Sequence, residues 1–175
     1  MNYLLRGIGV LTTVGVVSLI ASSLPSGEAR GDGGGNVLPR QTNNAWQQEC
    51  ASCHIAYAPA FLPKASWQRL MGTLDNHFGE NASLDPATQA DILKFLVAHA
   101  ADSGTSQMGR RVMQGAGAKD TPLRITESRW FVRKHDEVPR AVWSRKSVGS
   151  AANCAACHRQ AEHGVFDDDS VRIPK

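Results

Sequence analysis

Two five-residue peptides, CASCH at residues 50–54 and CAACH at residues 154–158, constrain this 175-residue chain more than any other feature. Together they contain all four of its cysteines. Cys-x-x-Cys-His is the attachment signature of c-type haem. Residues three apart share a face of a helical turn, so both thiols of one peptide can reach the edge of one porphyrin. The histidine that follows can bind the iron, and the sequence therefore predicts two covalently attached haems.

Other chemistry of paired cysteines is less compatible with this sequence. A split zinc ribbon does not need a histidine after each second cysteine, and its two halves usually lie closer together in the chain. A redox-active dithiol is expected within a βαβ pattern, which is not visible here, and two disulfides are the further alternative for an exported protein. The haem interpretation assigns Cys50, Cys53, Cys154 and Cys157 to the porphyrins and His54 and His158 to the irons.

The N-terminus has the composition of a secretory signal peptide over residues 1–29. Arg6 precedes an apolar run over residues 8–21, which is shorter than the ~20 residues that a membrane span needs, and small residues follow it. Cleavage after Ser23 or Ala29 fits this pattern, and retention as an N-terminal anchor is the alternative. We expect a periplasmic location without membrane contact after cleavage, because c-type haem is attached outside the cytoplasmic membrane.

The rest of the chain divides by composition into two helical regions. Residues 30–41 are rich in glycine, which predicts a disordered leader. Helical patterns follow over residues 42–101 and 122–175, and a connection with many glycines and small polar residues joins them at 102–121. We therefore predict a mainly α fold with one haem in each region. Regions of this size have small apolar cores, so the porphyrins are expected to complete them.

The first haem region begins with a short helix for which Thr42 or Asn43 is the expected N-cap. After the attachment motif, Pro59 and Pro63 break any helix and impose an extended loop. A backbone carbonyl of this loop, with the two prolines as candidates, is expected to orient the imidazole of His54.

Two further helices complete the predicted first region. The earlier one is expected to begin after Ser66 and to carry an apolar stripe that ends at His77 or Phe78. The later one opens at Asp85-Pro86, with a cap followed by proline, and runs to about Ala101. This order of elements is the layout of a class I cytochrome c domain, in which the distal iron ligand comes from the loop before the closing helix. His77 lies in that loop.

Three other side chains compete with His77 for the first iron. His99 lies on the apolar face of the closing helix, and Met108 and Met113 follow that helix in the connection. Methionine is a usual distal ligand of class I cytochromes, but its ordinary role in a small core is to fill gaps. We therefore favour His77 over both methionines.

The second haem region carries its own histidine at the end of an apolar stripe. A helix is expected to begin near Thr126, and it places Ser128, Phe131, Val132 and His135 on one face. Ser150 is the expected cap of the helix that carries the second attachment motif.

Four stretches together resemble a known family, the soluble periplasmic dihaem cytochromes c of purple bacteria and other proteobacteria. These are HFGENA at 77–82, PLRITE at 122–127, RKH at 133–135 and NCAACH at 153–158. The resemblance implies an N-terminal class I cytochrome c-like domain, a small C-terminal helical haem domain with a fold of its own, and bis-histidine irons. Carried over by position, it makes His54 and His77 the ligands of the first haem and His158 and His135 those of the second. His99 remains the main rival to His77.

The function expected from this coordination is electron transfer and not catalysis. Two nitrogen ligands leave no open position on the iron, and the absence of a methionine ligand, which raises the potential, predicts low-potential haems. The resemblance implies an oxygen-binding monohaem cytochrome c as acceptor and a membrane cytochrome b as donor. The alternative is a ligand-binding or peroxidase-type dihaem enzyme in which one distal histidine leaves the iron. Nucleic acid is excluded as a partner by the expected compartment.

The formal net charge of the chain is +3, and its positive residues gather in the C-terminal half. A basic surface of this kind can steer an acidic redox partner, while ordinary solubility explains it equally well. The residues concerned are Arg110, Arg111, Arg129, Arg133, Lys134, Arg140, Arg145 and Lys146.

Tyr57 is the only tyrosine left once the signal peptide is removed. It lies on the loop that leaves the first haem, and its ring is expected either to fill the gap between the two haems or to pack on one haem with its hydroxyl in water.

Overall fold

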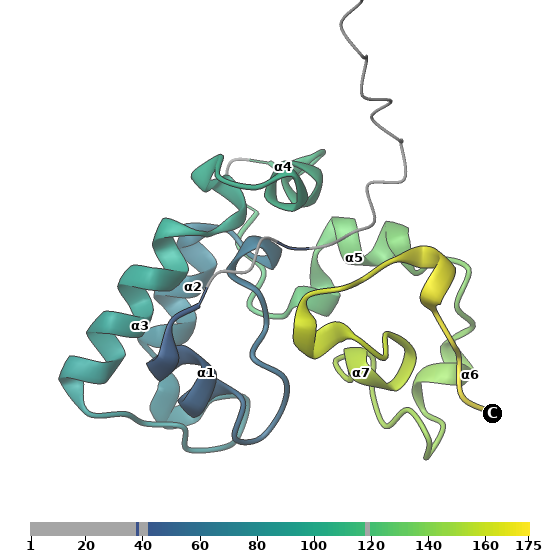
Figure 1. Cartoon of the computed structure of the whole chain (residues 1–175), viewed down its shortest axis with the longest axis horizontal. Coiled ribbons are helices and arrows are strands. Elements are labelled where there is room, and N and C mark those ends of the chain that lie inside the picture. The colour runs from purple at the N-terminus through teal and green to yellow at the C-terminus, as the bar shows by residue number, and fades with distance from the viewer. Residues whose placement is uncertain (1–37, 39–41, 118–119) are drawn as a thin grey trace, which may run out of the picture. The chain divides into compact units, whose positions relative to one another are not determined.

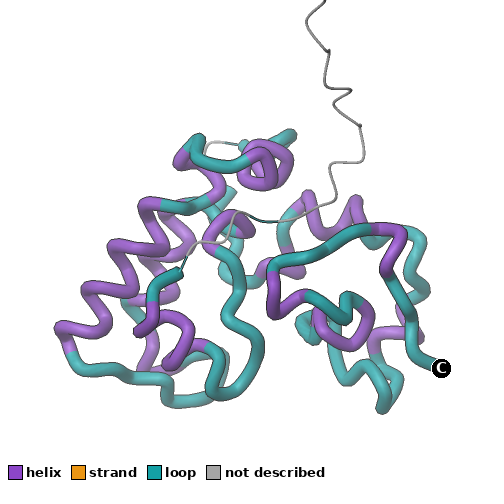
Figure 2. Tube along the Cα trace, viewed as in Figure 1, coloured by secondary structure: helices purple, strands orange, loops and turns teal. Residues whose placement is uncertain are grey.

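The computed structural model describes residue 38, residues 42–117 and residues 120–175, which lie in one compact unit covering residues 33–175. The described part is helical and contains no strand, as Figure 2 shows; one isolated bridge pairs His77 with Glu80. The predicted mainly α fold class is therefore confirmed. No helix in this part of the chain has both the length and the apolar character that a membrane span requires.

The described residues form seven α-helices and several short 3-10 helices (Figure 1). The α-helices are α1 (Asn44–Cys50), α2 (Lys64–Met71), α3 (Pro86–Ala98), α4 (Gln107–Met113), α5 (Arg129–Lys134), α6 (Arg140–Trp143) and α7 (Cys154–Cys157). The 3-10 helices are Pro59–Phe61, Leu74–Asn76, Ala101–Ser103, Ile125–Glu127, Ala161–His163 and Asp168–Ser170.

The predicted signal peptide and almost all of the predicted leader lie outside the described residues. Leu38 is the exception, and its contacts differ from the disorder that is predicted for the leader. Its side chain is buried, and its backbone N–H donates to the Gly164 carbonyl at 2.9 Å. Leu38 is thereby attached to the second haem region.

The first region is built on the contact of α2 with α3, which lie side by side in Figure 1, and α1 packs against α3. Leu62, Ile92 and Leu96 form the most deeply buried part of this core. The start of α3 agrees with the prediction: Asp85 Oδ1 accepts from the backbone N–H groups of the first turn, and Pro86 occupies the first helical position. Local sequence alone specifies this helix start.

The prediction for α2 was wrong at both ends. Pro63 is the N-cap, so Ser66 lies inside the helix, where its side chain is fully buried. The helix ends at Met71, and Gly72 is its C-cap. The apolar stripe therefore does not continue to His77, which follows a separate 3-10 turn.

A second cluster of buried residues fills the space under α4, and it contains Phe61, Met108, Val112 and Phe166. Met113 packs against its edge. Both methionines of the connection thus have the packing role that their sequence context favoured. Because residues of the first region, the connection and the second region share this cluster, the proposed division into two haem domains stays a prediction.

The second haem region consists of short helices whose starts differ from those predicted. Ser128, and not Thr126, caps α5: its Oγ accepts from the Phe131 N–H at 3.1 Å. Val132 is 56% exposed and so does not share the buried face with Phe131. The predicted cap at Ser150 is also wrong, because α7 starts after Asn153.

Candidate haem-binding sites

The two attachment motifs have different backbone conformations. Cys154 and Cys157 are the first and last residues of α7, which gives the single helical turn that the spacing predicts. Cys50, by contrast, is the last residue of α1, and Cys53 lies beyond the helix in a turn. The expectation of one helical turn is therefore correct for the second motif and wrong for the first.

All four cysteines are free thiols in the structure, and burial shifts the pKa of some of them. None of them forms a disulfide. Burial raises the pKa of the Cys50 and Cys154 thiols to about 11, so both are protonated at pH 7. Among the residues that the structure describes, no three His, Cys, Asp or Glu side chains gather around a possible metal position. The two motifs therefore do not come together as one zinc-ribbon site among the described residues.

The histidine of the first motif faces His77. The ring centroids of His54 and His77 are 6.3 Å apart, with 30° between the ring planes. His54 Nδ1 lies 2.7 Å from the Ile55 carbonyl oxygen, which leaves Nε2 available to a metal. The expected proline carbonyls do not have this role: the Pro59 oxygen accepts from the indole N–H of Trp67 at 2.8 Å.

The histidine of the second motif faces His135 at almost the same distance. The ring centroids of His135 and His158 are 6.2 Å apart, with 79° between the planes. His135 follows the last residue of α5, and its Nδ1 lies 2.9 Å from the Phe131 carbonyl oxygen. The Phe131 ring stacks on the His135 ring with a centroid separation of 4.0 Å, which fixes the imidazole in one orientation.

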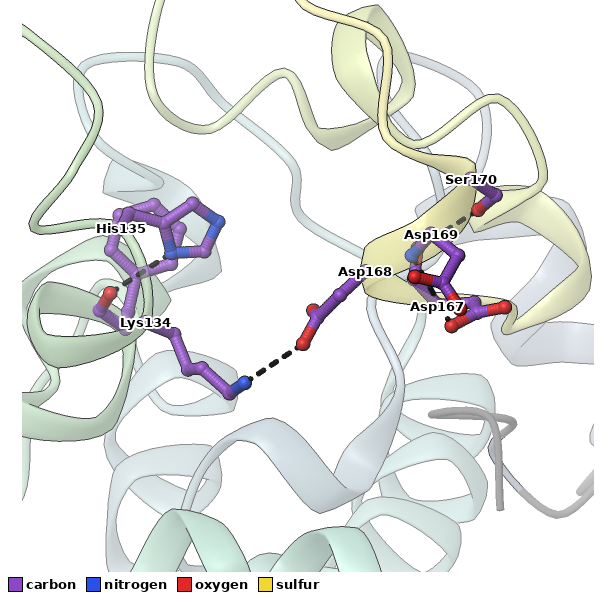
Figure 3. A network of polar contacts seen from close by, with 7 residues as sticks. Lys134, His135, Asp167, Asp168, Asp169 and Ser170 are labelled. Atoms are coloured by element: carbon purple, nitrogen blue, oxygen red, sulfur yellow. Dashed lines mark hydrogen bonds and ion pairs between the residues drawn. The ribbon is translucent and has the colours of Figure 1, made fainter. Parts of the chain in front are cut away.

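An ion pair lies beside the second histidine pair, and sequence reasoning missed it. Figure 3 shows Lys134 and Asp168 reaching toward each other next to His135; Lys134 Nζ is 3.1 Å from Asp168 Oδ2. Both groups are largely exposed, so their contribution to stability is small. The Lys134–Asp168 contact joins the residue before His135 to the last 3-10 helix, Asp168–Ser170.

Both separations fit one iron held between two imidazoles. Nitrogen–metal bonds of histidine are about 2.0 Å long, and a ring nitrogen lies roughly 1 Å from its ring centroid, so opposed ligands have centroids about 6 Å apart. Burial, with the nearby His54 and Arg124, lowers the pKa of His77, and burial with the nearby His135 lowers that of His158. A lowered pKa favours the neutral imidazole, which is the form that binds metal.

His99 belongs to neither pair. It is the C-cap of α3, and its ring contacts Phe95 with a centroid separation of 5.1 Å. No ring contact joins it to His54 or His77 within the described residues. Its buried Nδ1 has no hydrogen-bond partner in that part of the chain.

Tyr57 connects the first haem motif with the approach to the second. Its ring stacks on His54 with a centroid separation of 4.6 Å. Its hydroxyl donates to the Ala152 carbonyl oxygen at 2.6 Å, two residues before Cys154. Burial and the neighbouring Cys154 raise the pKa of Tyr57 to about 12, so the phenol stays protonated and remains a donor. The hydroxyl is thus bonded to the protein, and the role of Tyr57 between the two haems stays a prediction.

The comparison with known proteins agrees with these paired sites. A sequence profile of dihaem cytochrome c matches residues 46–166. The chain belongs to the dihaem cytochrome c family. It therefore carries two covalently attached haem c groups, and it is an electron-transfer protein and not an enzyme. The peroxidase-type alternative is excluded by this membership.

Solved structures of the same kind resemble this dihaem cytochrome c. One, the diheme cytochrome c from Rhodobacter sphaeroides, is 48% identical, covers 71% of this chain and 97% of its own, and gives a TM-score of 0.65. Another, the diheme cytochrome from Shewanella baltica OS155, is 41% identical, covers 78% of this chain and 95% of its own, and gives a TM-score of 0.62. No curated protein matches the chain.

Proposed function

We propose that this dihaem cytochrome c is a low-potential periplasmic electron carrier in which each iron is held by two histidines. The opposed imidazoles, with ring centroids 6.3 Å and 6.2 Å apart, carry this proposal. Haem iron supplies the one-electron chemistry when it is bound. His54 and His77 would hold the iron at the first site, and His158 and His135 would hold it at the second. With two histidines bound, each iron would have no open position for a substrate.

The low potential follows from the same residues. A methionine ligand raises the potential of a c-type haem, and here Met108 is buried in the cluster under α4. Two irons that were each held by a pair of histidines would favour a carrier that acts as a reductant. The sequence resemblance suggests an oxygen-binding monohaem cytochrome c as acceptor and a membrane cytochrome b as donor. The signal-peptide pattern of residues 1–29 supports a periplasmic location.

A pyridine haemochrome assay combined with a spectroelectrochemical titration tests this function. We expect a c-type α-band at two haems per chain, two six-coordinate low-spin ferric centres, and two reductive steps at negative potentials. An iron–methionine charge-transfer band, or a high-spin centre in the unmodified protein, would contradict bis-histidine ligation. The absence of the c-type α-band would remove the function altogether.

Tyr57 is proposed to provide a bonded path between the two haem sites. Replacing Tyr57 by Phe keeps the ring on His54 and removes the bond to the Ala152 carbonyl. We expect slower electron exchange between the haems and a free energy of unfolding lower by about 1 kcal/mol, the value of one such hydrogen bond. Pulse radiolysis, which follows re-equilibration after reduction of one haem, measures the exchange.

Tyr57→Leu removes both the ring contact with His54 and the hydroxyl bond to Ala152, whereas Tyr57→Phe removes only the bond. Comparing the two variants therefore separates the effect of the ring from that of the hydroxyl. We expect this variant to exchange electrons more slowly than Tyr57→Phe. If both variants matched the unmodified protein in exchange rate, Tyr57 would be a packing residue of the first site only.

A further inference from the structure

His77 is presented by an unusual tight turn. The backbones of His77 and Glu80 bond each other in both directions, at 2.7 Å and 3.2 Å, which makes Phe78-Gly79 a two-residue hairpin loop. Phe78 has φ of 58° and Gly79 has φ of 106°, the signs that a type I′ turn requires. Such turns favour asparagine before the glycine. Of the described residues other than glycine, Phe78 alone has a positive φ.

Burial in a core does not explain why a phenylalanine occupies this position. Phe78 is 44% exposed, and a bulky residue at positive φ is a strained exception in proteins. Such exceptions gather at functional sites, where the surrounding structure holds them in place. The contacts of the Phe78 ring are therefore the evidence for its role.

The ring of Phe78 contacts a charged residue and the candidate ligand. Its ring meets the His77 imidazole edge-on, with centroids 4.8 Å apart and 62° between the planes. The guanidinium carbon of Arg124 lies 3.9 Å from the Phe78 ring centroid, a cation–π contact. Arg124 comes from the segment just before α5 and so reaches the turn from outside it. The ring of Phe78 thus contacts both the guanidinium and the imidazole.

The second site contains a comparable arrangement without the strain. There the Phe131 ring stacks on His135, and Phe131 is a buried residue of α5. A helix holds that ring in place. Phe78 lies in a turn and not in a helix. Its ring is held in place by the contact with Arg124 instead.

We propose that Phe78, held in place by Arg124, is a positioning residue that orients the His77 imidazole and keeps it on the iron of the first haem. This inference rests on the proposed assignment of His77 as a ligand. The strained backbone is the consequence of putting an aromatic ring, and not an asparagine, at the one turn position that adjoins the imidazole.

Phe78→Asn tests the inference because it separates the ring from the turn. Asparagine suits the positive φ, so the variant should mature and fold at least as well as the unmodified protein. Without the ring, the ferrous first haem should bind CO roughly tenfold faster, the size of one aromatic contact. In the ferric protein, one of the two low-spin EPR signals should shift and the other should stay.

Two further variants separate the cation from the ring. Arg124→Gln leaves Phe78 and its turn intact, and we expect a smaller increase in the CO-binding rate in the same direction. Glu127→Gln is the matched control: it removes the 3.7 Å ion pair of Arg124 but keeps the guanidinium on Phe78, so CO binding should not change. If Phe78→Asn and Arg124→Gln both bound CO at the unmodified rate with unshifted EPR signals, the positioning role would be wrong.

His77→Ala distinguishes this inference from the proposed function. A high-spin first haem in His77→Ala, together with an unaffected Phe78→Asn, would overturn the positioning role and leave the ligand assignment standing. If His77→Ala left both haems low-spin, the assignment and the positioning role would both be wrong.

Discussion

Replacing His77 by alanine is expected to convert one of the two haems from low-spin to high-spin and leave the other unchanged. The reason is geometric: the His77 ring faces His54 at 6.3 Å, and without it the first iron would be left with a single histidine ligand. The ferrous variant should then bind one CO per chain, while the unmodified protein binds CO slowly or not at all. Visible and EPR spectra of the ferric protein and CO titration of the ferrous protein measure these changes.

His135→Ala should have the same effect at the second haem, because His135 faces His158 at 6.2 Å. The double variant with His77→Ala and His135→Ala should leave both irons able to bind CO. It should therefore bind twice as much CO per chain as either single variant. The change at each site is all or none, which makes these the largest spectroscopic effects that single substitutions in this chain can produce.

His99→Ala is the matched control for the first haem. His99 packs on Phe95 and makes no ring contact with His54 among the described residues, so its removal should leave both haems six-coordinate. Should His99→Ala produce the high-spin site and His77→Ala fail to do so, the ligand assignment of the first haem would have to be exchanged.

The motifs and the start of α3 could be predicted from sequence because their determinants are local. A cysteine pair and its histidine lie within five residues, and Asp85-Pro86 carries both the cap and the first helical position of α3. Periodicity predicted the buried Ile92 and Leu96, since α3 is long enough to repeat its pattern over several turns.

Short helices and turns are where prediction failed. An apolar stripe cannot show that α2 stops at Met71, because apolar residues continue beyond Gly72, which is the C-cap of the helix. The exposed Val132 was assigned to a buried face because α5 has too few turns to define one. Phe78 gave no sign of its positive φ, since the turn it occupies ordinarily takes asparagine.

Contacts between distant parts of the chain could be predicted from the sequence only in part. The aromatic character of Tyr57 suggested a bridge, but its bond to Ala152 depends on how two segments far apart in sequence meet. The same holds for the guanidinium of Arg124 over Phe78. Composition indicates which residues are able to make such contacts, and the fold determines which of them do.

Loss of the second haem is expected to unfold residues 122–175 and to leave the first region folded. Its helices α5, α6 and α7 contain only six, four and four residues, whereas isolated helices need about 12–15 residues to be stable in water. Few of its apolar side chains are buried: Phe131, Val142, Val148, Ala161 and Phe166. The covalently attached porphyrin must therefore supply much of the apolar core of this region.

The double variant Cys154→Ala with Cys157→Ala removes both attachment points of that haem. We expect one haem per chain by pyridine haemochrome, trypsin cleavage throughout residues 122–175, and a protected fragment that contains α2 and α3. The matched variant, Cys50→Ala with Cys53→Ala, removes the first haem, yet Ile92 and Leu96 should keep that protein core resistant for longer, because they are fully buried against protein atoms. Equal protease resistance of the two variants, or a protected 122–175 fragment without its haem, would show that the short helices fold on their own.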